Sequence, residues 1–421
     1  MLYHLFQSLE KFDIPGQGLF TYLSFRAIMA SMTAILVAVF AGNSIIRLLQ
    51  RKQIGEEIRD LGLEGQMSKK GTPTMGGIII ILAIFSGVLL YSDLTNIYTL
   101  LLAGTTLWLG ALGFADDYIK VFRHNKEGLS EKKKLAGQMI LGLIIGLTVC
   151  FNGNIVVRES VHAERHDMTE IQADGTQAAA ADVIKSTKTT IPFVKNHEFD
   201  YAWLSPFKGA WGWYCKWAVY VIMIVLVITA CSNGTNLTDG LDGLATGTSA
   251  IVGVVLGVFA WLSGNIINAE YLNIMYISGT GEIAVFMAAF VGALIGFLWH
   301  NSFPARVFMG DTGSLAIGGI IGVCAILIRK ELLLPILCGI FFVESLSVLL
   351  QRGYFKYTKM RYGEGRRIFK MTPLHHHFQK EGIPALIEAP RRGLPEAKIT
   401  VRFWIIGIIL AVFTIAMLKL R

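Results

Sequence analysis

Long apolar runs constrain this chain more than any other feature of its sequence. A helix needs about 20 mostly apolar residues to cross the hydrocarbon core of a bilayer. Ten runs reach or approach this length, and one of them is short and rich in glycine. They lie near 28–49, 75–91, 97–115, 135–151, 213–231, 244–262, 283–299, 315–328, 332–350 and 401–418.

These runs predict an all-α polytopic membrane protein with ten transmembrane helices. Only 16% of the residues are charged, against about a quarter in soluble domains. Only helices and closed barrels satisfy their backbone in lipid, and runs this long do not alternate as barrel strands do. We expect residues 1–421 to form one integral membrane domain, with the first run kept as an anchor and not removed as a signal peptide.

Basic residues are distributed unevenly between the loops. If all ten runs cross the membrane, one side carries the loops near 50–74, 116–134, 232–243, 300–314 and 351–400. These loops contain 23 Lys and Arg residues, whereas the other side contains six once its one long loop is set aside. Because cytoplasmic loops are enriched in Lys and Arg, the first set is predicted to face the cytoplasm.

The long loop, 152–212, is predicted to be an extracytoplasmic insertion. Its middle is polar and has few large apolar residues to order it. The tryptophans toward its far end fit an aromatic belt at the membrane interface, and they are Trp203, Trp211, Trp213 and Trp217. We expect the chain to tolerate removal of about residues 165–195, although a role in dimer contact or partner docking stays open.

Charge and cysteine usage narrow the class of protein. The formal net charge of +8 is explained in a membrane protein by cytoplasmic loops and by anionic lipid or substrate, without nucleic acid as a partner. The five cysteines form no C-x-x-C pair and lie mostly in apolar runs. This usage indicates packing, and it does not indicate a disulfide framework or a zinc site.

The first polar motif, Lys69–Gly77, precedes the second apolar run. Its two lysines can meet phosphates, and its glycines let a backbone approach a ligand closely. A helix start with a positive flank explains the same residues.

The second motif places Asp116 and Asp117 at the cytoplasmic end of the third run. Adjacent carboxylates repel one another unless a divalent cation or a cationic group offsets them. A solvated helix end is the alternative interpretation.

The third motif runs from Asn233 to Ala245 and contains Asn236, Asp239 and Asp242. The two aspartates share a face if the segment forms a helical turn. The loop has no Lys or Arg although its cytoplasmic neighbours are basic, so the positive-inside rule does not explain it. An Asx-rich turn is the structural alternative.

The fourth motif, His300–Ser314, ends in Gly-Asp-Thr-Gly-Ser at the start of an apolar run. Such a start can cap a helix, or it can place Asp311 and several backbone N–H groups beside a phosphate. The glycines are not followed by Lys-Ser or Lys-Thr, so the motif is not a P-loop.

The fifth motif is Pro373–Phe378, with three consecutive histidines in a basic loop. Consecutive side chains point in different directions, so one metal ion is not expected to bind all three. Imidazoles near phosphates explain them better. Glu344 lies inside the ninth run, where an acid is a functional candidate unless it faces a polar seam between helices.

All five motifs fall on the predicted cytoplasmic side. Carboxylates, lysines and histidines that converge at one membrane face describe a site for a metal ion and a phosphate-bearing, anionic substrate. A transporter would place its polar groups near the bilayer midplane, often within an internal repeat. We find no repeat, so the pattern favours an enzyme over a transporter or flippase.

The motifs resemble those of the polyprenyl-phosphate N-acetylhexosamine-1-phosphate transferases. Pro-Leu-His-His-His-Phe is similar to the branch that uses a muramoyl-pentapeptide donor, and UDP-GlcNAc is the donor of the alternative branch. The long 152–212 loop departs from the family pattern without touching the motifs. The matching stretches occur in family order along most of the chain, at Lys70–Gly77, Asp116–Lys120, Asn236–Ala245, Asn301–Ser314 and Pro373–Phe378.

The resemblance implies a homodimer in the bacterial inner membrane, with ten helices, a cytoplasmic active site and Mg²⁺. It implies the transfer of phospho-MurNAc-pentapeptide from UDP-MurNAc-pentapeptide to undecaprenyl phosphate. The products would be lipid I and UMP, in the first membrane step of peptidoglycan synthesis. Whether attack is direct or passes through a phospho-enzyme stays open.

The resemblance also implies roles for single residues. Asp311 and Asp117 would bind Mg²⁺, and one of the adjacent aspartates, preferably Asp116, would assist the attack of the lipid phosphate. Lys120 and Lys134 would neutralise phosphates, and His375 completes the set expected to take part in catalysis. The donor pocket would be lined by Lys70, Asn236, Asp239, Asp242, Asn301, Phe308, Gln351, His376 and His377.

Overall fold

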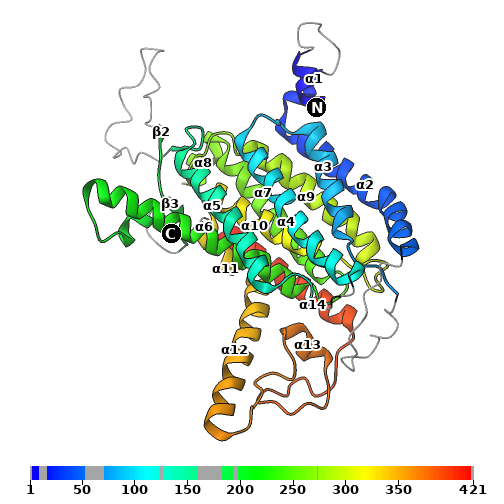
Figure 1. Ribbon diagram of the computed structural model, residues 1–421. Coiled ribbons are helices and arrows are strands. Elements are labelled where there is room, and N and C mark those ends of the chain that lie inside the picture. Colours follow the sequence, from blue (N-terminus) through cyan, green and yellow to red (C-terminus); the bar gives the residue numbers. More distant parts are fainter. Residues whose placement is uncertain are drawn as a thin grey trace, which may run out of the picture.

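The computed structural model describes residues 2–8, 17–52, 71–123, 125, 127–158, 183–192, 198–272 and 274–418. Within these ranges the chain is a bundle of long helices, with four short strands outside it (Figure 1). The first part contains α1 (Leu2–Ser8), η2 (Gln17–Thr21), α2 (Leu23–Arg51), α3 (Gly77–Tyr91), α4 (Ile97–Phe122) and α5 (Glu131–Phe151).

The four strands and one 3-10 helix lie between α5 and α6. They are β1 (Val157–Arg158), β2 (Val183–Ile184), β3 (Lys188–Thr190), β4 (Glu198–Asp200) and η5 (Tyr201–Leu204). The second part contains α6 (Gly209–Thr238), α7 (Leu244–Ser263), α8 (Ile266–Leu272), α9 (Gly281–Asn301), α10 (Gly310–Leu327), η6 (Glu331–Leu333), α11 (Leu334–Leu337), α12 (Gly339–Tyr362), α13 (Leu374–Gln379) and α14 (Glu396–Met417).

The predicted multi-pass helical architecture is confirmed. In the described part of the chain, eight helices are long and apolar enough to cross a membrane, namely α2, α4, α5, α6, α7, α9, α10 and α14. A ninth span results if Glu331–Leu337 and Gly339–Tyr362, which meet at a bend of 77°, count as one. The run near 75–91 forms α3, an apolar helix of 15 residues. The count of ten spans stays a prediction.

Several helices continue beyond the apolar runs that predict them. α4 extends to Phe122 and α6 extends to Thr238, so Asp116, Asp117 and Asn236 lie on helices where the sequence predicts loops. The predicted boundaries were wrong here because polar residues end an apolar run without ending a helix. Their side chains are bonded to neighbouring helices, which compensates for burying them.

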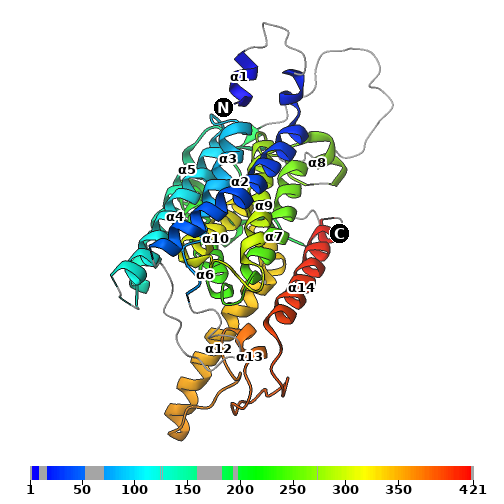
Figure 2. The same cartoon turned by 90° about the vertical axis from the view of Figure 1, so that its right-hand side faces the viewer.

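One end of the bundle collects the polar motifs, and we call it the motif end. It comprises the last turns of α4 and α6, the first turn of α10, and the segment from α12 to the start of α14. In Figures 1 and 2 it points downward, and α12 and α13 project beyond the other helices there.

α10 is the centre of the bundle, and nearly all of its residues are buried. It packs against α4, α6 and α3. Its sequence is rich in glycine and alanine, and small side chains let helices approach closely where lipid supplies no hydrophobic driving force. The residues at its start are therefore held against several neighbouring helices.

Part of the 152–212 segment is anchored to the opposite end of the bundle. β3 pairs antiparallel with β4, and Thr190 donates its backbone N–H to the carbonyl of Arg329 at 3.0 Å. Lys330 donates from Nζ to Oγ1 of Thr190 at 2.6 Å. Tyr201 in η5 donates to Glu331 at 3.2 Å. The dispensable stretch predicted from composition therefore has to end before β3.

The tryptophans of this segment divide into two groups. Trp203, Trp211 and Trp213 are exposed, as a belt at the membrane interface requires. Trp217 is buried instead, with its ring against Tyr220. The prediction that all four face the interface was wrong for Trp217, because α6 already lies against the bundle at that point.

Candidate active site

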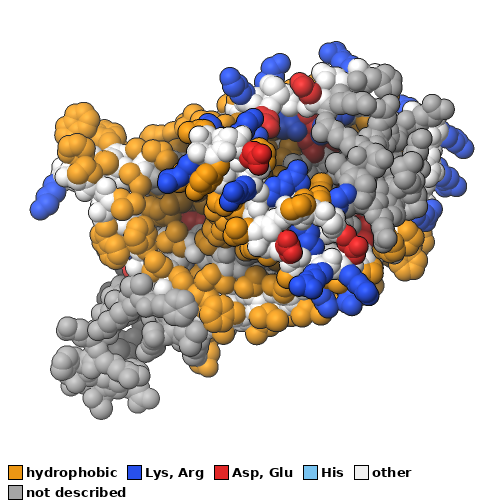
Figure 3. Space-filling view, turned by 90° about the horizontal axis from the view of Figure 1, so that it is seen from below, with side chains coloured by type: hydrophobic (Ala, Val, Ile, Leu, Met, Phe, Trp, Pro, Cys, Tyr) orange, Lys and Arg blue, Asp and Glu red, His pale blue; other side chains and the backbone are white. Residues whose placement is uncertain are grey.

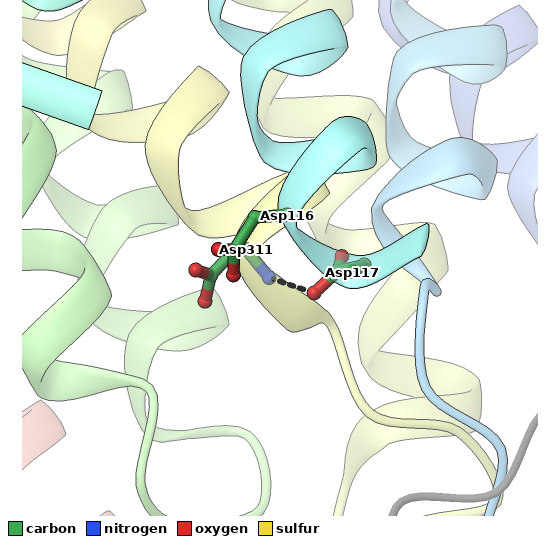
Figure 4. Close-up of side chains that lie close together, drawn as sticks. All are labelled: Asp116, Asp117 and Asp311. Atoms are coloured by element: carbon green, nitrogen blue, oxygen red, sulfur yellow. Dashed lines mark hydrogen bonds between the residues drawn. The ribbon is translucent and has the colours of Figure 1, made fainter. Parts of the chain in front are cut away.

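Three carboxylates from two helices form the centre of the motif end. Asp116 and Asp117 lie near the end of α4, and Asp311 lies in the first turn of α10 (Figure 4). Each can offer one oxygen such that the three oxygens lie within 4.8 Å of one another. α4 and α10 approach closely here, since a Cβ on Gly113 would lie 2.1 Å from the carbonyl oxygen of Asp311. Any side chain at Gly113 would separate the carboxylates.

Two lysines lie between Asp116 and Asp311. Lys120 on α4 places Nζ 2.6 Å from Oδ2 of Asp116 and 3.3 Å from Oδ2 of Asp311. Lys134 on α5 places Nζ 3.0 Å and 2.5 Å from the same two oxygens. Opposite charges at these distances offset the repulsion between carboxylates. The predicted convergence of these four residues is therefore observed.

Asp117 has different partners from its neighbour Asp116. Its Oδ1 accepts from the backbone N–H of Asp311 at 3.1 Å. Its Oδ2 accepts from the backbone N–H and the hydroxyl of Thr312, at 2.9 and 2.6 Å. The first N–H groups of a helix have no partner within the helix. Asp117 thus caps α10 from outside and fixes the helix that carries Asp311.

Asn236 connects the end of α6 to the same centre. Its Nδ2 donates to Oδ1 of Asp311 at 2.8 Å and to Oγ of Ser314 at 2.9 Å. Every side-chain oxygen of Asp311 therefore has a donor within the protein. The place of Asn236 in the donor pocket stays a prediction, and the described structure shows its side chain bonded to Asp311.

The turn after α6 carries Asp239 and Asp242. Asp239 ends the helix and the following residues form turns, so the two aspartates do not share a helical face as a helical turn would require. Asp239 is half-buried, whereas Asp242 is buried and its Oδ2 accepts from the backbone N–H of Ala305 at 3.0 Å. Asp242 thus joins this turn to the loop that precedes α10.

Asn301 makes a second connection between the same segments. Its Oδ1 accepts from the backbone of Gly243 at 3.2 Å and from the hydroxyl of Thr246 at 2.8 Å. Its Nδ2 donates to the carbonyl of Val307 at 3.0 Å. The side chain is buried, and both its oxygen and its nitrogen take part in these bonds. Direct contact between Asn301 and a substrate stays a prediction.

The later residues of the first motif, Lys69–Gly77, pair with the loop before α10. The backbone N–H of Phe308 donates to Pro73, and that of Gly76 donates to Phe308, both at 2.8 Å. These bonds place the backbone of Phe308 beside the start of α3, and the residue is half-buried. Lys70, for which the resemblance predicts a place in the donor pocket, lies outside the described residues.

The three histidines of α13 have three different environments, as consecutive side chains are predicted to have. His375 is buried beside Glu344 of α12, with Nδ1 3.2 Å from Oε1. His376 pairs through Nδ1 with Gln379 at 2.8 Å. His377 accepts from the backbone of Lys370 through Nδ1 at 3.1 Å, and Nε2 donates to the carbonyl of Ala389 at 2.8 Å.

His377 closes the loop between α12 and α14. Its hydrogen bonds require a neutral ring with the proton on Nε2, because Nδ1 accepts. Burial lowers the pKa of His377 below the ordinary value and favours that neutral form. Gln351 on α12 supports the same loop, since Oε1 accepts from the backbone of Ile368 and of Phe369 at 2.9 and 3.0 Å.

Sequence reasoning missed the contribution of α14. The carboxylate of Glu396 accepts from the backbone N–H of Asp242 at 2.6 Å, and the hydroxyl of Thr400 donates to the backbone carbonyl of Asp242 at 3.2 Å. Trp404 donates to the carbonyl of Gly243 at 3.3 Å. These residues are four apart and share one helical face. That spacing was readable in the sequence, but it does not indicate which segment faces it.

The surface of the motif end is basic around a hollow (Figure 3). Exposed cations on this end include Lys132, Arg352, Arg361, Arg391 and Arg392. The central cluster itself sets three carboxylates, Asp116, Asp117 and Asp311, against two ammonium groups, Lys120 and Lys134. It therefore carries one uncompensated negative charge inside a positive surround.

The residues of the cluster fit a divalent cation. Carboxylate oxygens are the ligands that Mg²⁺ prefers. The cluster has one more negative than positive charge, so a bound cation would be stabilised there and would then attract phosphate. In the described structure, Oδ1 of Asp117 accepts one hydrogen bond, from the backbone of Asp311, and keeps a lone pair.

The fold and the site together define a class: a polytopic membrane protein with a buried carboxylate–lysine centre at one end, suited to a phosphate-bearing substrate. Residues 175–329 match glycosyl transferase family 4, and residues 69–81 match the phospho-N-acetylmuramoyl-pentapeptide-transferase signature 1.

Curated proteins from several bacteria are similar over the whole chain. The phospho-N-acetylmuramoyl-pentapeptide-transferases of Parabacteroides distasonis, Porphyromonas gingivalis and Flavobacterium psychrophilum are 58%, 57% and 54% identical, each with 100% of both chains covered. This chain belongs to the phospho-N-acetylmuramoyl-pentapeptide-transferase family.

Proposed function

We propose that this protein transfers phospho-MurNAc-pentapeptide from UDP-MurNAc-pentapeptide to undecaprenyl phosphate, with lipid I and UMP as products. The names of the full-length relatives support the donor sugar and its peptide. The observation that carries the proposal is the pairing of Lys120 and Lys134 with both Asp116 and Asp311. Such a centre can compensate both a donor pyrophosphate and an acceptor phosphate.

We propose Mg²⁺ as the cofactor, held by Asp311 and Asp117. The ion would supply charge compensation for the donor pyrophosphate and for the UMP leaving group. Asp117 also holds α10 in place, so its two roles reinforce each other.

The lysines and Asp116 act on the phosphates themselves. In the substrate complex, Lys120 and Lys134 exchange a carboxylate for a phosphate oxygen, which stabilises charge that develops during transfer. Asp116 takes the proton of a protonated lipid phosphate or orients its attack. A phosphomonoester has a second pKa of about 6, so much of it is already dianionic at neutral pH and positioning dominates.

The donor nucleotide is assigned to the surface formed by the turn after α6, the loop before α10 and α13. Asn236, Asp239 and Phe308 are half-buried in the described structure, so they have surface available to a ligand. Lys70 is proposed for the same pocket from its motif alone. Asp242 and Asn301 support this surface through bonds to its backbone. Gln351 and His377 bond the backbone of the loop that leads into α13, and His376 lies on α13 itself.

We propose that the motif end faces the cytoplasm of the bacterial inner membrane and that the protein forms a homodimer. The basic loops support the orientation. UDP-linked sugars are cytoplasmic substrates, so the site and its donor would lie on the same side.

The experiment that tests the metal assignment is a Mg²⁺ titration of UMP release after treatment with EDTA. We expect activity to return with Mg²⁺ in the wild type and to stay lost in Asp311→Asn. Glu364→Gln removes an exposed carboxylate on the motif end and is the matched control. Wild-type activity and metal dependence in Asp311→Asn would contradict the assignment.

A further inference from the structure

Glu344 is a carboxylate in an apolar part of α12, and it is fully buried. An unpaired carboxylate is strongly disfavoured in such surroundings. Its partners therefore indicate why the chain keeps it. Among the ion pairs of the described residues, Glu344 occurs once, with His375.

The backbone and the ring of His375 both lie close to the carboxylate of Glu344. The backbone N–H of His375 donates to Oε1 of Glu344 at 3.1 Å, and Nδ1 lies 3.2 Å from the same oxygen. Nδ1 itself makes no hydrogen bond in the described structure, so the backbone bond is what ties His375 to the carboxylate. Glu344 thus holds His375 in position through its backbone and places a negative charge beside Nδ1.

The opposite edge of the ring lies against the turn that follows α6. A Cβ on Gly240 would lie 2.2 Å from Nε2 of His375, so the ring occupies the space below that residue. Nε2 is buried and has no hydrogen-bond partner in the described structure. Gly240 itself is exposed and lies between Asp239 and Asp242.

We propose that Glu344 is a positioning residue of the transfer reaction, which holds His375 against Gly240 and so fixes the turn that binds the donor nucleotide. The inference rests on the proposed function, because that function assigns the turn to the donor. Glu344 acts here through His375 and touches no substrate.

The mechanism predicts which kinetic constant changes. Glu344→Gln keeps the volume and a carbonyl acceptor for the backbone N–H, but it removes the charge at Nδ1. The KM for UDP-MurNAc-pentapeptide should rise about tenfold, the usual scale for loss of a residue that orients a functional side chain. The kcat and the Mg²⁺ concentration for half-activation should change less, because the carboxylate cluster is untouched.

Ser347→Ala is the matched control. Ser347 is buried one turn further along α12, and its hydroxyl donates to the backbone carbonyl of Glu344, not to the carboxylate. We expect this variant to keep the wild-type KM. A rise equal to that of Glu344→Gln would mean that general packing of α12 is responsible, and it would overturn the proposal.

The decisive comparison combines these changes with His375→Ala. If Glu344 acts through His375, Glu344→Gln should raise the KM no further in the His375→Ala background. Gly240→Ala should be damaging beside the intact ring and tolerated once the ring is gone. The comparison of Gly240→Ala with and without His375→Ala remains informative if Glu344→Gln does not fold. An undiminished effect of both changes in the His375→Ala background would refute the positioning role.

The same measurements separate this inference from the proposed function. Absence of turnover by the wild type with UDP-MurNAc-pentapeptide would overturn the function itself. Normal turnover by the wild type and by His375→Ala would leave the function in place and overturn the inference.

Discussion

Asp117 on α4 accepts two hydrogen bonds from Thr312 on α10, one from its backbone nitrogen at 2.9 Å and one from its hydroxyl at 2.6 Å. The residue before Thr312 is Asp311. The distance between the carboxylates of the site is therefore determined by a helix cap that another helix supplies.

Removal of the Thr312 hydroxyl should weaken this cap while every carboxylate and lysine of the cluster stays in the chain. We expect Thr312→Val to destabilise the protein by roughly 1.5–3 kcal/mol, the range for a hydrogen bond to a charged group. Transfer activity should fall because Asp311 is held less firmly. Thermal melting in detergent, measured beside UMP release, checks both effects.

Thr414→Val in α14 is the control for this change. Thr414 is also buried, but its hydroxyl bonds the carbonyl of Leu410 within its own helix. The Thr414→Val variant should keep its transfer activity. Equal losses in the two variants would show that any buried threonine has this effect.

Lys134 should be essential, whereas its neighbour should not. We expect Lys134→Met to lower kcat by about two orders of magnitude, or roughly 3 kcal/mol of barrier. The reason is that Nζ lies within 3.0 Å of both Asp116 and Asp311. Lys133→Met removes an exposed charge next to it and should stay within a few-fold of the wild type. Steady-state UMP release distinguishes the two, and a reversed order of effects would move the site to the other lysine.

His377 should make the loop between α12 and α14 sensitive to acid. Its pKa is lowered in the folded protein by burial, so the unfolded chain binds a proton first as the pH falls. Folding stability should therefore decrease as the pH drops below about 6.5, the ordinary histidine pKa, and continue to decrease through the folded pKa. At higher pH the ring is neutral in both states and contributes no pH dependence.

The measurement is the melting temperature of the wild type and His377→Gln between pH 8 and about 5.5. Gln keeps a donor that can reach the carbonyl of Ala389 but has no group that titrates in this range. The wild type should lose more of its melting temperature than the variant does. Parallel curves would show that other groups set the acid sensitivity.

The anchored strand and the rest of the 152–212 segment should behave differently on mutation. We expect Thr190→Val to lower the melting temperature, because Nζ of the buried Lys330 loses its acceptor at 2.6 Å. A deletion of residues 165–180, which ends before β2 and β3, should keep activity within a few-fold. Loss of activity in a well-folded deletion would reveal a role in dimer contact or partner docking.

The sequence could predict which motifs meet, because span parity places Asp116, Asn236 and Asp311 at one face of the membrane. It could not predict the hydrogen bonds among them. Asp116 and Asp117 are chemically identical neighbours, and only the packing of α10 decides that one pairs with lysines while the other caps a helix.

Predicted and observed helix ends differ where polar residues end an apolar run. A charged residue that is bonded to a neighbouring helix can extend a helix, as Asp116 does, although it lowers the local hydropathy that predicts the span. The partners of Glu396 lie some 150 residues earlier in the chain, at Asp242. No local pattern specifies such a contact, whereas the helical spacing of Glu396, Thr400 and Trp404 does specify that they share a face.

The central claim is that the carboxylate–lysine centre transfers phospho-MurNAc-pentapeptide to a lipid phosphate. The most direct measurement is UMP release by purified protein from UDP-MurNAc-pentapeptide and, separately, from UDP-GlcNAc, each with and without undecaprenyl phosphate and Mg²⁺. We expect release from the muramoyl donor alone, and only when both the lipid phosphate and the metal are present. Faster release from UDP-GlcNAc, or release that does not require the lipid phosphate, would contradict the account.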